Sequence, residues 1–151
     1  MNLTEDAIKS AVRFIRYRPR SKKEVYDKLR RKGFNIEIIE EVISFLEKNS
    51  LLNDEEFARL WVNERLVLKK SSVIKIKMEL RAKGISDDII ERVLSDIEVD
   101  EVENATNLLF QKFSKVNKKS LDRDKLLRKL LSNGFSYTTS EKAVNNFFEK
   151  F

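Results

Sequence analysis

Apolar residues recur at helical spacing in nine successive segments of the chain, and no segment alternates between apolar and polar positions as a half-buried strand would. In the first segment Ala7 and Ile15 fall on one helical face, after Thr4 as the predicted N-cap. Pro19 is expected to end this helix by about Arg18, because a proline disfavours helical backbone in the residue before it. The pattern predicts an all-α protein of about nine helices.

The glycines of the chain, Gly33, Gly84 and Gly134, lie 51 and 50 residues apart, and each follows a predicted second helix. A residue just past a helix often takes a left-handed conformation that only glycine adopts without steric cost, and an apolar pair then closes the helix end. That pair recurs as Leu29 with Phe34, Leu80 with Ile85, and Leu130 with Phe135. We expect one helix terminator used three times, with no ligand at any glycine.

The predicted helix starts repeat in the same register. Ser21 and Glu24 form a capping box, in which each side chain satisfies a backbone donor of the first turn. Second helices are expected to begin at Ser21, Ser72 and Asp122, and third helices at Asn35, Ser86 and Ser136. The sequence thus predicts three tandem three-helix units, residues 1–50, 51–99 and 100–151, in an elongated, curved array of either hand.

The first helices of the later units are expected over about 54–69 and 101–116. The apolar positions of the former are Phe57, Leu60, Trp61 and Leu68. In the last helix, Thr139 and Ser140 stand where the first two units have pairs of isoleucines, so we expect the third unit to pack more loosely.

The composition narrows the function. The chain has no cysteine and no histidine, which removes thiolate chemistry, disulfides and the commonest metal ligand and general base, so an enzyme is not favoured. The chain does not open with a basic segment followed by an apolar one, and no window approaches about 18 apolar residues, so we expect a soluble, cytoplasmic protein. A net charge of +6 favours an acidic partner, with nucleic acid first.

The sign of the charge alternates along the chain: segments 13–32, 65–83 and 112–129 are basic, whereas 36–64 and 86–104 are acidic. Two helices around a glycine turn suggest a helix-turn-helix, but phosphates would repel the acidic third helix from the major groove. Solvation and the helix dipole account for many single charges without any function. The threefold recurrence of the basic segment predicts a binding face on the second helices and the segments before them.

Aromatic residues offer few further candidates. Trp61 lies among helical apolar positions, which favours a core role, whereas Tyr17 stands amid arginines and suits either base stacking or ordinary surface. Phe147 occupies a core position of the repeat, while Phe148 and Phe151 form a docking patch or cover the end of the array.

The chain resembles the RecX family, bacterial regulators of the RecA recombinase, in LLNDEEFA at 51–58 followed by Trp61 and Val62, in MELRAKGI at 78–85, and in SKKEV at 21–25 with KGF at 32–34. The resemblance extends over nearly the whole chain. Two stretches depart from it: the turn before the second helix of unit two, usually glycine-containing in the family, reads KKSS at 69–72, and the third repeat matches poorly after Phe135.

The resemblance implies a non-enzymatic regulator without a cofactor, mainly an inhibitor. Its three units would lie in the groove of the RecA filament on single-stranded DNA and limit filament growth, ATP hydrolysis and strand exchange. We expect a monomer. The candidate contact residues are basic, namely Arg16, Arg18, Arg20, Lys22, Lys23, Arg30, Arg31, Lys69, Lys70, Lys75, Lys77, Arg81, Lys119, Arg123 and Lys125.

These side chains are expected to dock electrostatically on DNA phosphates or on an acidic RecA surface. Two alternatives stay open. One is an autonomous DNA-binding protein that uses the basic segments, with strongly salt-dependent affinity for naked DNA. The other is a protein-protein adaptor that uses the acidic third helices or the phenylalanine-rich end.

Overall fold

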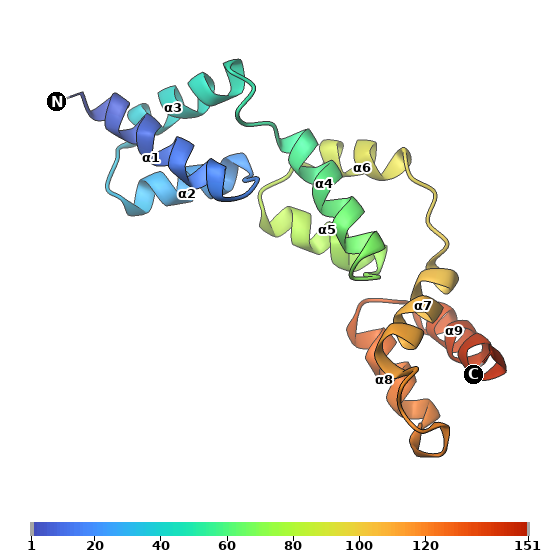
Figure 1. Ribbon diagram of the computed structural model, residues 1–151. Helices are drawn as coiled ribbons and strands as arrows, with labels where there is room; N and C mark the ends of the chain where they lie inside the picture. Colours follow the sequence, from blue (N-terminus) through green and yellow to red (C-terminus); the bar gives the residue numbers. More distant parts are fainter. Residues whose placement is uncertain (1, 151) are drawn as a thin grey trace. The chain divides into compact units, whose positions relative to one another are not determined.

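The computed structural model describes residues 2–150, except for the side chain of residue 118, so Phe151 lies outside the described residues. Within this range the chain forms nine α-helices and one 3₁₀ helix, η1, and no strand (Figure 1), which confirms the all-α prediction. The helices are α1 (Leu3–Tyr17), α2 (Lys22–Arg31), α3 (Ile36–Lys48), α4 (Asp54–Val67), α5 (Val73–Ala82), α6 (Asp87–Ser95), α7 (Glu101–Phe113), η1 (Lys118–Ser120), α8 (Arg123–Ser132) and α9 (Tyr137–Lys150).

Most of the predicted helix starts are confirmed. Ser21, Asn35 and Asp122 are the N-caps of α2, α3 and α8, each accepting a hydrogen bond from a backbone N–H of the first turn. The prediction for α1 was wrong: Asn2 is its N-cap and accepts from the Thr4 N–H at 2.9 Å. Asparagine caps a helix at least as well as threonine, so the helix begins two residues earlier than predicted.

The glycine turns have the geometry of a left-handed helix end. Gly33, Gly84 and Gly134 have φ of 93°, 80° and 90°. The N–H after each glycine donates to the carbonyl of the leucine four residues before the glycine, with N···O distances of 3.2, 3.0 and 3.2 Å. This bond satisfies a carbonyl that the helix end would otherwise leave without a partner.

The chain divides into two compact units, and the division falls inside α4, α5 and α6. Unit 1 holds the residues up to Leu60 together with Leu80–Val93, and unit 2 holds Trp61–Glu79 together with the residues from Leu94 onward. The three-unit boundaries at 50 and 99 stay a prediction.

In unit 1, α1, α2 and α3 pack against one another around one apolar core. Its buried members are Ala7, Ala11, Val25, Leu29, Ile39, Val42, Leu46 and Leu52. Except for Leu52, which lies in the linker after α3, these residues recur at three- and four-residue steps within each helix, so one face of each helix supplies the core.

In unit 2, α7 and α8 pack against α9 around a second core. Phe147 is fully buried, as its repeat position predicts, with its ring centroid 4.8 Å from that of Phe110 and 5.7 Å from that of Phe148. Phe148 thus covers this core. Ser140 is also fully buried, and its Oγ has no hydrogen-bond partner among residues 2–150.

Two apolar residues near α4 are not buried as their helical spacing suggested. Leu60 is 51% exposed and Leu68, just after the helix, is 61% exposed, whereas Phe57 and Val62 are buried. The apolar residues of α4 are spread around the helix, so their spacing alone does not select the buried face.

Polar contacts tie the starts of α2 and α5 to a later segment of the same unit. In unit 1 the Lys22 N–H donates to Asp54 Oδ1 at 2.8 Å. In unit 2 the Val73 N–H donates to Glu101 Oε1 at 2.7 Å. In each case a carboxylate at the start of one helix satisfies a free N–H in the first turn of another.

Candidate functional site

The first basic segment lies where α1 ends and the chain turns toward α2. Arg18 is extended, with φ −165° and ψ 163°, because the following Pro19 disfavours helical backbone there. The turn leaves Tyr17 84% exposed, so its ring is accessible to a partner. Arg16 is also exposed, and its side chain makes no ion pair or hydrogen bond within the described part of the chain.

A single carboxylate, that of Glu24, holds three cations of unit 1. Its Oε2 accepts a hydrogen bond from Arg18 and lies 3.6 Å from Arg20 Nη1 and 3.7 Å from Lys83 Nζ. Burial would raise the pKa of Glu24, but the hydrogen bonds from Arg18 and the Ser21 N–H, with the charge of Lys83, outweigh burial and lower it. Glu24 is therefore ionised at neutral pH and fixes Arg18 and Arg20 in the fold.

Arg20 is a structural residue rather than a free cation. Its guanidinium carbon lies 3.8 Å from the centroid of the Phe14 ring and 5.8 Å from that of Tyr17, and its Nε donates to the Phe14 carbonyl at 3.1 Å. The side chain is only 10% exposed. Burial is the main cause that lowers the pKa of Arg20, although the guanidinium remains charged.

Two lysines of α2 are also paired. Lys22 Nζ lies 2.9 Å from Glu47 Oε2, and this hydrogen bond is the main reason that the pKa of Lys22 is raised. Lys23 Nζ lies 2.9 Å from Asp27 Oδ2, one turn along the same helix. Both pairs are partly exposed, so a stronger external anion can compete for either lysine.

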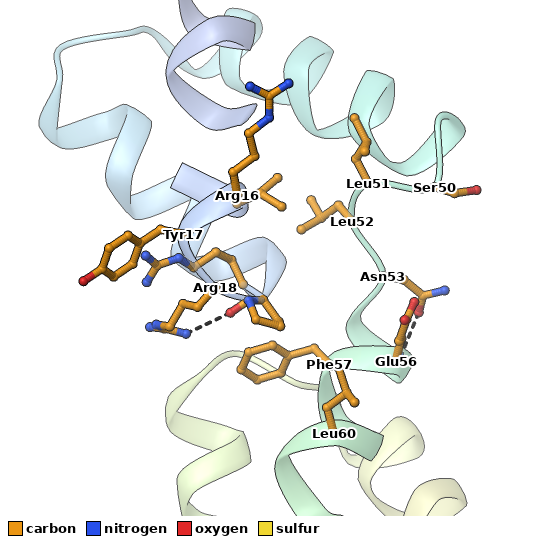
Figure 2. A pocket seen from close by; sticks show the side chains of 13 residues that line it. Arg16, Tyr17, Arg18, Ser50, Leu51, Leu52, Asn53, Glu56, Phe57 and Leu60 are labelled. Atoms are coloured by element: carbon orange, nitrogen blue, oxygen red, sulfur yellow. Dashed lines mark hydrogen bonds between the residues drawn. The ribbon is translucent and has the colours of Figure 1, made fainter. Parts of the chain in front are cut away.

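A pocket of about 450 Å³ opens beside the turn between α1 and α2. Figure 2 shows Tyr17 and Arg18 on one side of it and Leu52, Phe57 and Leu60 on the other. Its lining comes from the end of α1 and the following turn, from the linker between α3 and α4, and from α4: Ile15, Arg16, Tyr17, Arg18, Pro19, Arg20, Ser50, Leu51, Leu52, Asn53, Glu56, Phe57 and Leu60.

The rim of this pocket combines apolar surface with charge. Leu51 and Leu60 are 45% and 51% exposed, and Arg16 adds a cation without an internal partner. Such a rim can receive an apolar or aromatic group and attract a neighbouring anion. It holds neither histidine nor cysteine, so it suits binding better than nucleophilic or acid–base chemistry.

The predicted cations of the second and third basic segments differ in whether their side chains make contacts within the chain. Lys75 Nζ donates to Asn133 Oδ1 at 3.2 Å, and Lys77 also interacts within the chain. Arg81 Nε lies 2.9 Å from Asp87 Oδ1. Lys125 Nζ lies 5.9 Å from the centroid of the Phe113 ring.

The fifteen predicted contact residues therefore fall into two groups. Nine interact within the chain, among them Arg31, whose Nε donates to the Asp27 carbonyl at 3.4 Å. Within the region that the structure describes, the side chains of the other six make no ion pair, hydrogen bond or ring contact: Arg16, Arg30, Lys69, Lys70, Lys119 and Arg123. Each basic segment contributes two of these six.

Sequence reasoning missed the role of Lys83, whose Nζ joins the Glu24 cluster and whose carbonyl accepts from Ser21. Its place just before Gly84 marks a turn, but not the contact with a residue about sixty positions earlier. It also missed the exposed apolar rim of the pocket, because Leu60 occupies a helical apolar position in the sequence and Leu51 lies in a linker where no spacing indicates its exposure.

Two other kinds of site are absent from the residues that the structure describes. No three histidine, cysteine, aspartate or glutamate side chains in residues 2–150 are placed to hold a metal ion. No helix in the same range combines the length and apolar character needed to cross a membrane.

Two family models match the chain: one described as the first three-helix domain of RecX, over residues 7–46, and one described as the second, over residues 53–94. Among curated proteins, the regulatory protein RecX of Clostridium perfringens strain 13 is 38% identical over 140 residues, which cover 89% of this chain and 65% of that protein. This chain thus spans about two-thirds of the length of that relative.

A relative of similar length also matches. The regulatory protein RecX of Prosthecochloris aestuarii is 34% identical over 144 residues, which cover 94% of this chain and 93% of that protein. Among solved structures, the crystal structure of RecX from Lactobacillus salivarius superposes with a TM-score of 0.76 at 27% identity and covers 97% of both chains.

Proposed function

Because the chain belongs to the RecX family of regulatory proteins, we propose that it regulates the RecA recombinase by docking on the RecA filament assembled on single-stranded DNA. In this proposal the protein acts as a monomer in the cytoplasm, catalyses no reaction and uses no cofactor. Its main effect is inhibitory: bound protein limits filament growth and lowers the rates of ATP hydrolysis and strand exchange.

One observation on this chain supports the proposal independently of family membership. Among residues 2–150, each of the three basic segments retains at least two cations whose side chains make no ion pair, hydrogen bond or ring contact within the chain, among them Arg16 and Arg30 in the first, Lys69 and Lys70 in the second, and Lys119 and Arg123 in the third. A cation already paired within the chain must give up that contact to bind a new anion, whereas an unpaired cation gives up no such contact. Repeated free cations therefore favour a polyanionic partner such as a nucleoprotein filament.

The pairing within the chain also selects the residues for a charge-reversal test. Reversing Lys75 or Arg81 would break contacts with Asn133 or Asp87, so a lost effect would be ambiguous. Arg30 and Lys69 are exposed and make no such contact. Arg30→Glu with Lys69→Glu is the informative pair.

The experiment adds the protein to RecA on single-stranded DNA and measures ATP hydrolysis and strand exchange. Wild-type protein should lower both rates, and R30E/K69E should need a several-fold higher concentration for the same effect. The control K48E/K142E makes the same change in net charge at exposed sites outside the basic segments and should act like wild type.

The same proteins distinguish the alternatives. Unchanged RecA rates at saturating wild-type protein would refute the proposal. Tight, salt-dependent binding to naked DNA would favour an autonomous DNA-binding protein. Inhibition that survives R30E/K69E undiminished would point to contacts through the acidic helices instead.

A further inference from the structure

A second pocket of unit 1, of about 390 Å³, lies on α1 and the turn between α2 and α3, and none of its lining residues is among the fifteen predicted contact residues. It is lined by Asp6, Lys9, Ser10, Arg13, Lys32 and Phe34. Its volume is at the lower end of the range of about 300–1,000 Å³ that is typical of small-ligand sites.

Three cations line this pocket. Lys9 and Arg13 lie one turn apart on α1, and Lys32 is the C-cap residue of α2. None of the three makes an ion pair or side-chain hydrogen bond in the range 2–150. Like charges one helical turn apart repel each other. With Asp6 as the only carboxylate in the lining, the side-chain charge around the pocket is about +2.

A hydroxyl group adds a second observation. The Oγ of Ser10 is buried and has no hydrogen-bond partner in the structure, and Ser10 lies on α1 between Lys9 and Arg13. A buried hydroxyl without a partner is unfavourable, because it has lost its bonds to water without replacing them. A rotation about χ1 of Ser10 would turn this donor toward the acceptor oxygens of a ligand in the pocket.

We propose that this pocket binds a phosphate group. Two lysines and an arginine supply the positive charge, Ser10 supplies a neutral donor, and Phe34 gives one apolar wall against which a sugar or base can pack. The phosphate is either a phosphodiester of a nucleic-acid backbone or the phosphate monoester of a free nucleotide or of inorganic phosphate. This inference stands apart from regulation of RecA, since none of its residues is among the fifteen predicted contact residues and its test does not use the recombinase.

The test uses the full chain labelled with nitrogen-15 and followed by amide chemical shifts. One arm titrates inorganic phosphate and the other a short single-stranded oligothymidylate, each against sodium chloride at equal ionic strength. We expect saturable shifts at Ser10, Arg13, Gly33 and Phe34 with at least one probe. A response to phosphate alone assigns a monoester site, and a response to the oligonucleotide assigns a backbone site.

Substitutions then separate a built site from general attraction. K9Q/R13Q should weaken binding at least about tenfold, a change of about 1.4 kcal/mol. In the oligonucleotide arm it should also lower the slope of log affinity against log salt by about 0.7 for each lost phosphate contact. Ser10→Ala should weaken binding without any change in charge, and Asp6→Asn should strengthen it.

Lys142→Gln removes one exposed cation of α9 and should leave affinity for either probe unchanged. The proposal is overturned if neither probe gives saturable shifts at the pocket, or if K9Q/R13Q binds as tightly as wild type. Circular dichroism checks that each variant keeps its helical content, and Ser10→Ala, a small change in the middle of a helix, keeps the test valid if the double variant fails to fold.

Discussion

The Ser21 hydroxyl donates a hydrogen bond of 2.7 Å to the carbonyl oxygen of Lys83, 62 residues further along the chain. The same relationship recurs in unit 2, where the Ser72 hydroxyl donates to the Asn133 carbonyl at 2.7 Å. Each serine is fully buried and also accepts a hydrogen bond from the N–H three residues later. One hydroxyl therefore caps a helix and holds the glycine turn of a later segment.

Ser21→Ala should cost more stability than the loss of an ordinary cap. Removing a serine N-cap costs about 1 kcal/mol, and leaving the Lys83 carbonyl without its donor should add about 1 kcal/mol. Ser86→Ala is the matched control, because Ser86 is an exposed cap that accepts only from the Ile89 N–H at 3.3 Å. Urea unfolding of the two variants measures the difference, and equal losses would contradict a double role for Ser21.

Gly84→Ala should destabilise the protein more than Gly33→Ala, although both glycines have positive φ. Alanine at Gly33 meets no atom within 4 Å, so only the left-handed backbone costs free energy, about 1 kcal/mol. A Cβ at Gly84 would lie 2.5 Å from Lys23 Cβ, which the helix backbone holds in place. The melting temperature should be highest for wild type, lower for G33A and lowest for G84A. A lower melting temperature for G33A than for G84A would refute this reasoning.

Ser140→Ala should stabilise unit 2. The Ser140 Oγ is fully buried without a hydrogen-bond partner, and the alanine removes that unpaired hydroxyl and favours the helix. The expected gain is about 1 kcal/mol in the free energy of unfolding. Ser132→Ala, at an exposed residue whose hydroxyl donates to the Lys129 carbonyl at 2.8 Å, is the comparison and should give no gain.

The Glu24 cluster should make stability fall in acid. The pKa of Glu24 is lowered in the folded protein, so its contribution is complete above the unfolded-state value of about 4.3 and is lost as the pH falls through the folded-state pKa. Glu24→Gln should therefore lower stability at neutral pH and reduce its further loss in acid. Urea unfolding at a series of pH values between about 6 and 3 measures both effects.

Asp54, in the same unit, should have the opposite effect on the pH dependence of stability. Burial is the main cause that raises the pKa of Asp54, against the hydrogen bond from the Lys22 N–H. A raised carboxyl pKa makes the folded state bind its proton first, so this group favours folding more as the pH falls. Asp54→Asn should consequently steepen the acid loss, and a change in the same direction as Glu24→Gln would contradict the two assignments.

Replacing Arg16 and replacing Arg20 should have different effects on stability, although both are arginines of one basic segment. Arg20→Ala removes the contact with the Phe14 ring and one cation of the Glu24 cluster, and should lower the free energy of unfolding by about 2 kcal/mol. Arg16→Ala should leave the melting temperature unchanged and weaken only the effect on RecA. A destabilised Arg16→Ala, or a stable Arg20→Ala, would show that the two roles are wrongly assigned.

The helices could be predicted because each has several independent signals. Around α2, for example, the Ser21 cap, the apolar pair Val25 and Leu29, and the Gly33 terminator agree with one another. The predicted start of α1 was wrong because both Asn2 and Thr4 are good N-caps, and local sequence alone does not choose between them. The buried face of α4 could not be chosen because its apolar residues surround the helix.

For the candidate site, the sequence predicts which residue types are present but not which of them are free to bind a partner. The sequence shows where cations are frequent, but whether a cation is free depends on partners distant in sequence, such as Glu47 for Lys22 and Asn133 for Lys75. Arg20 and Arg16 look equivalent in the sequence, yet one is packed on Phe14 and the other is exposed. The pocket proposed to bind phosphate could not be predicted, because its lining comes from two separate segments of unit 1.

The contacts at the start of the second helices also indicate where the chain tolerates changes of length. The Lys22 N–H reaches a carboxylate 32 residues later, whereas the Val73 N–H reaches one only 28 residues later. The intervening third helices differ by the same amount, since α3 has 13 residues and α6 has 9. A whole turn of third helix can therefore be gained or lost in evolution, or by engineering, while the serine and carboxylate contacts stay in register.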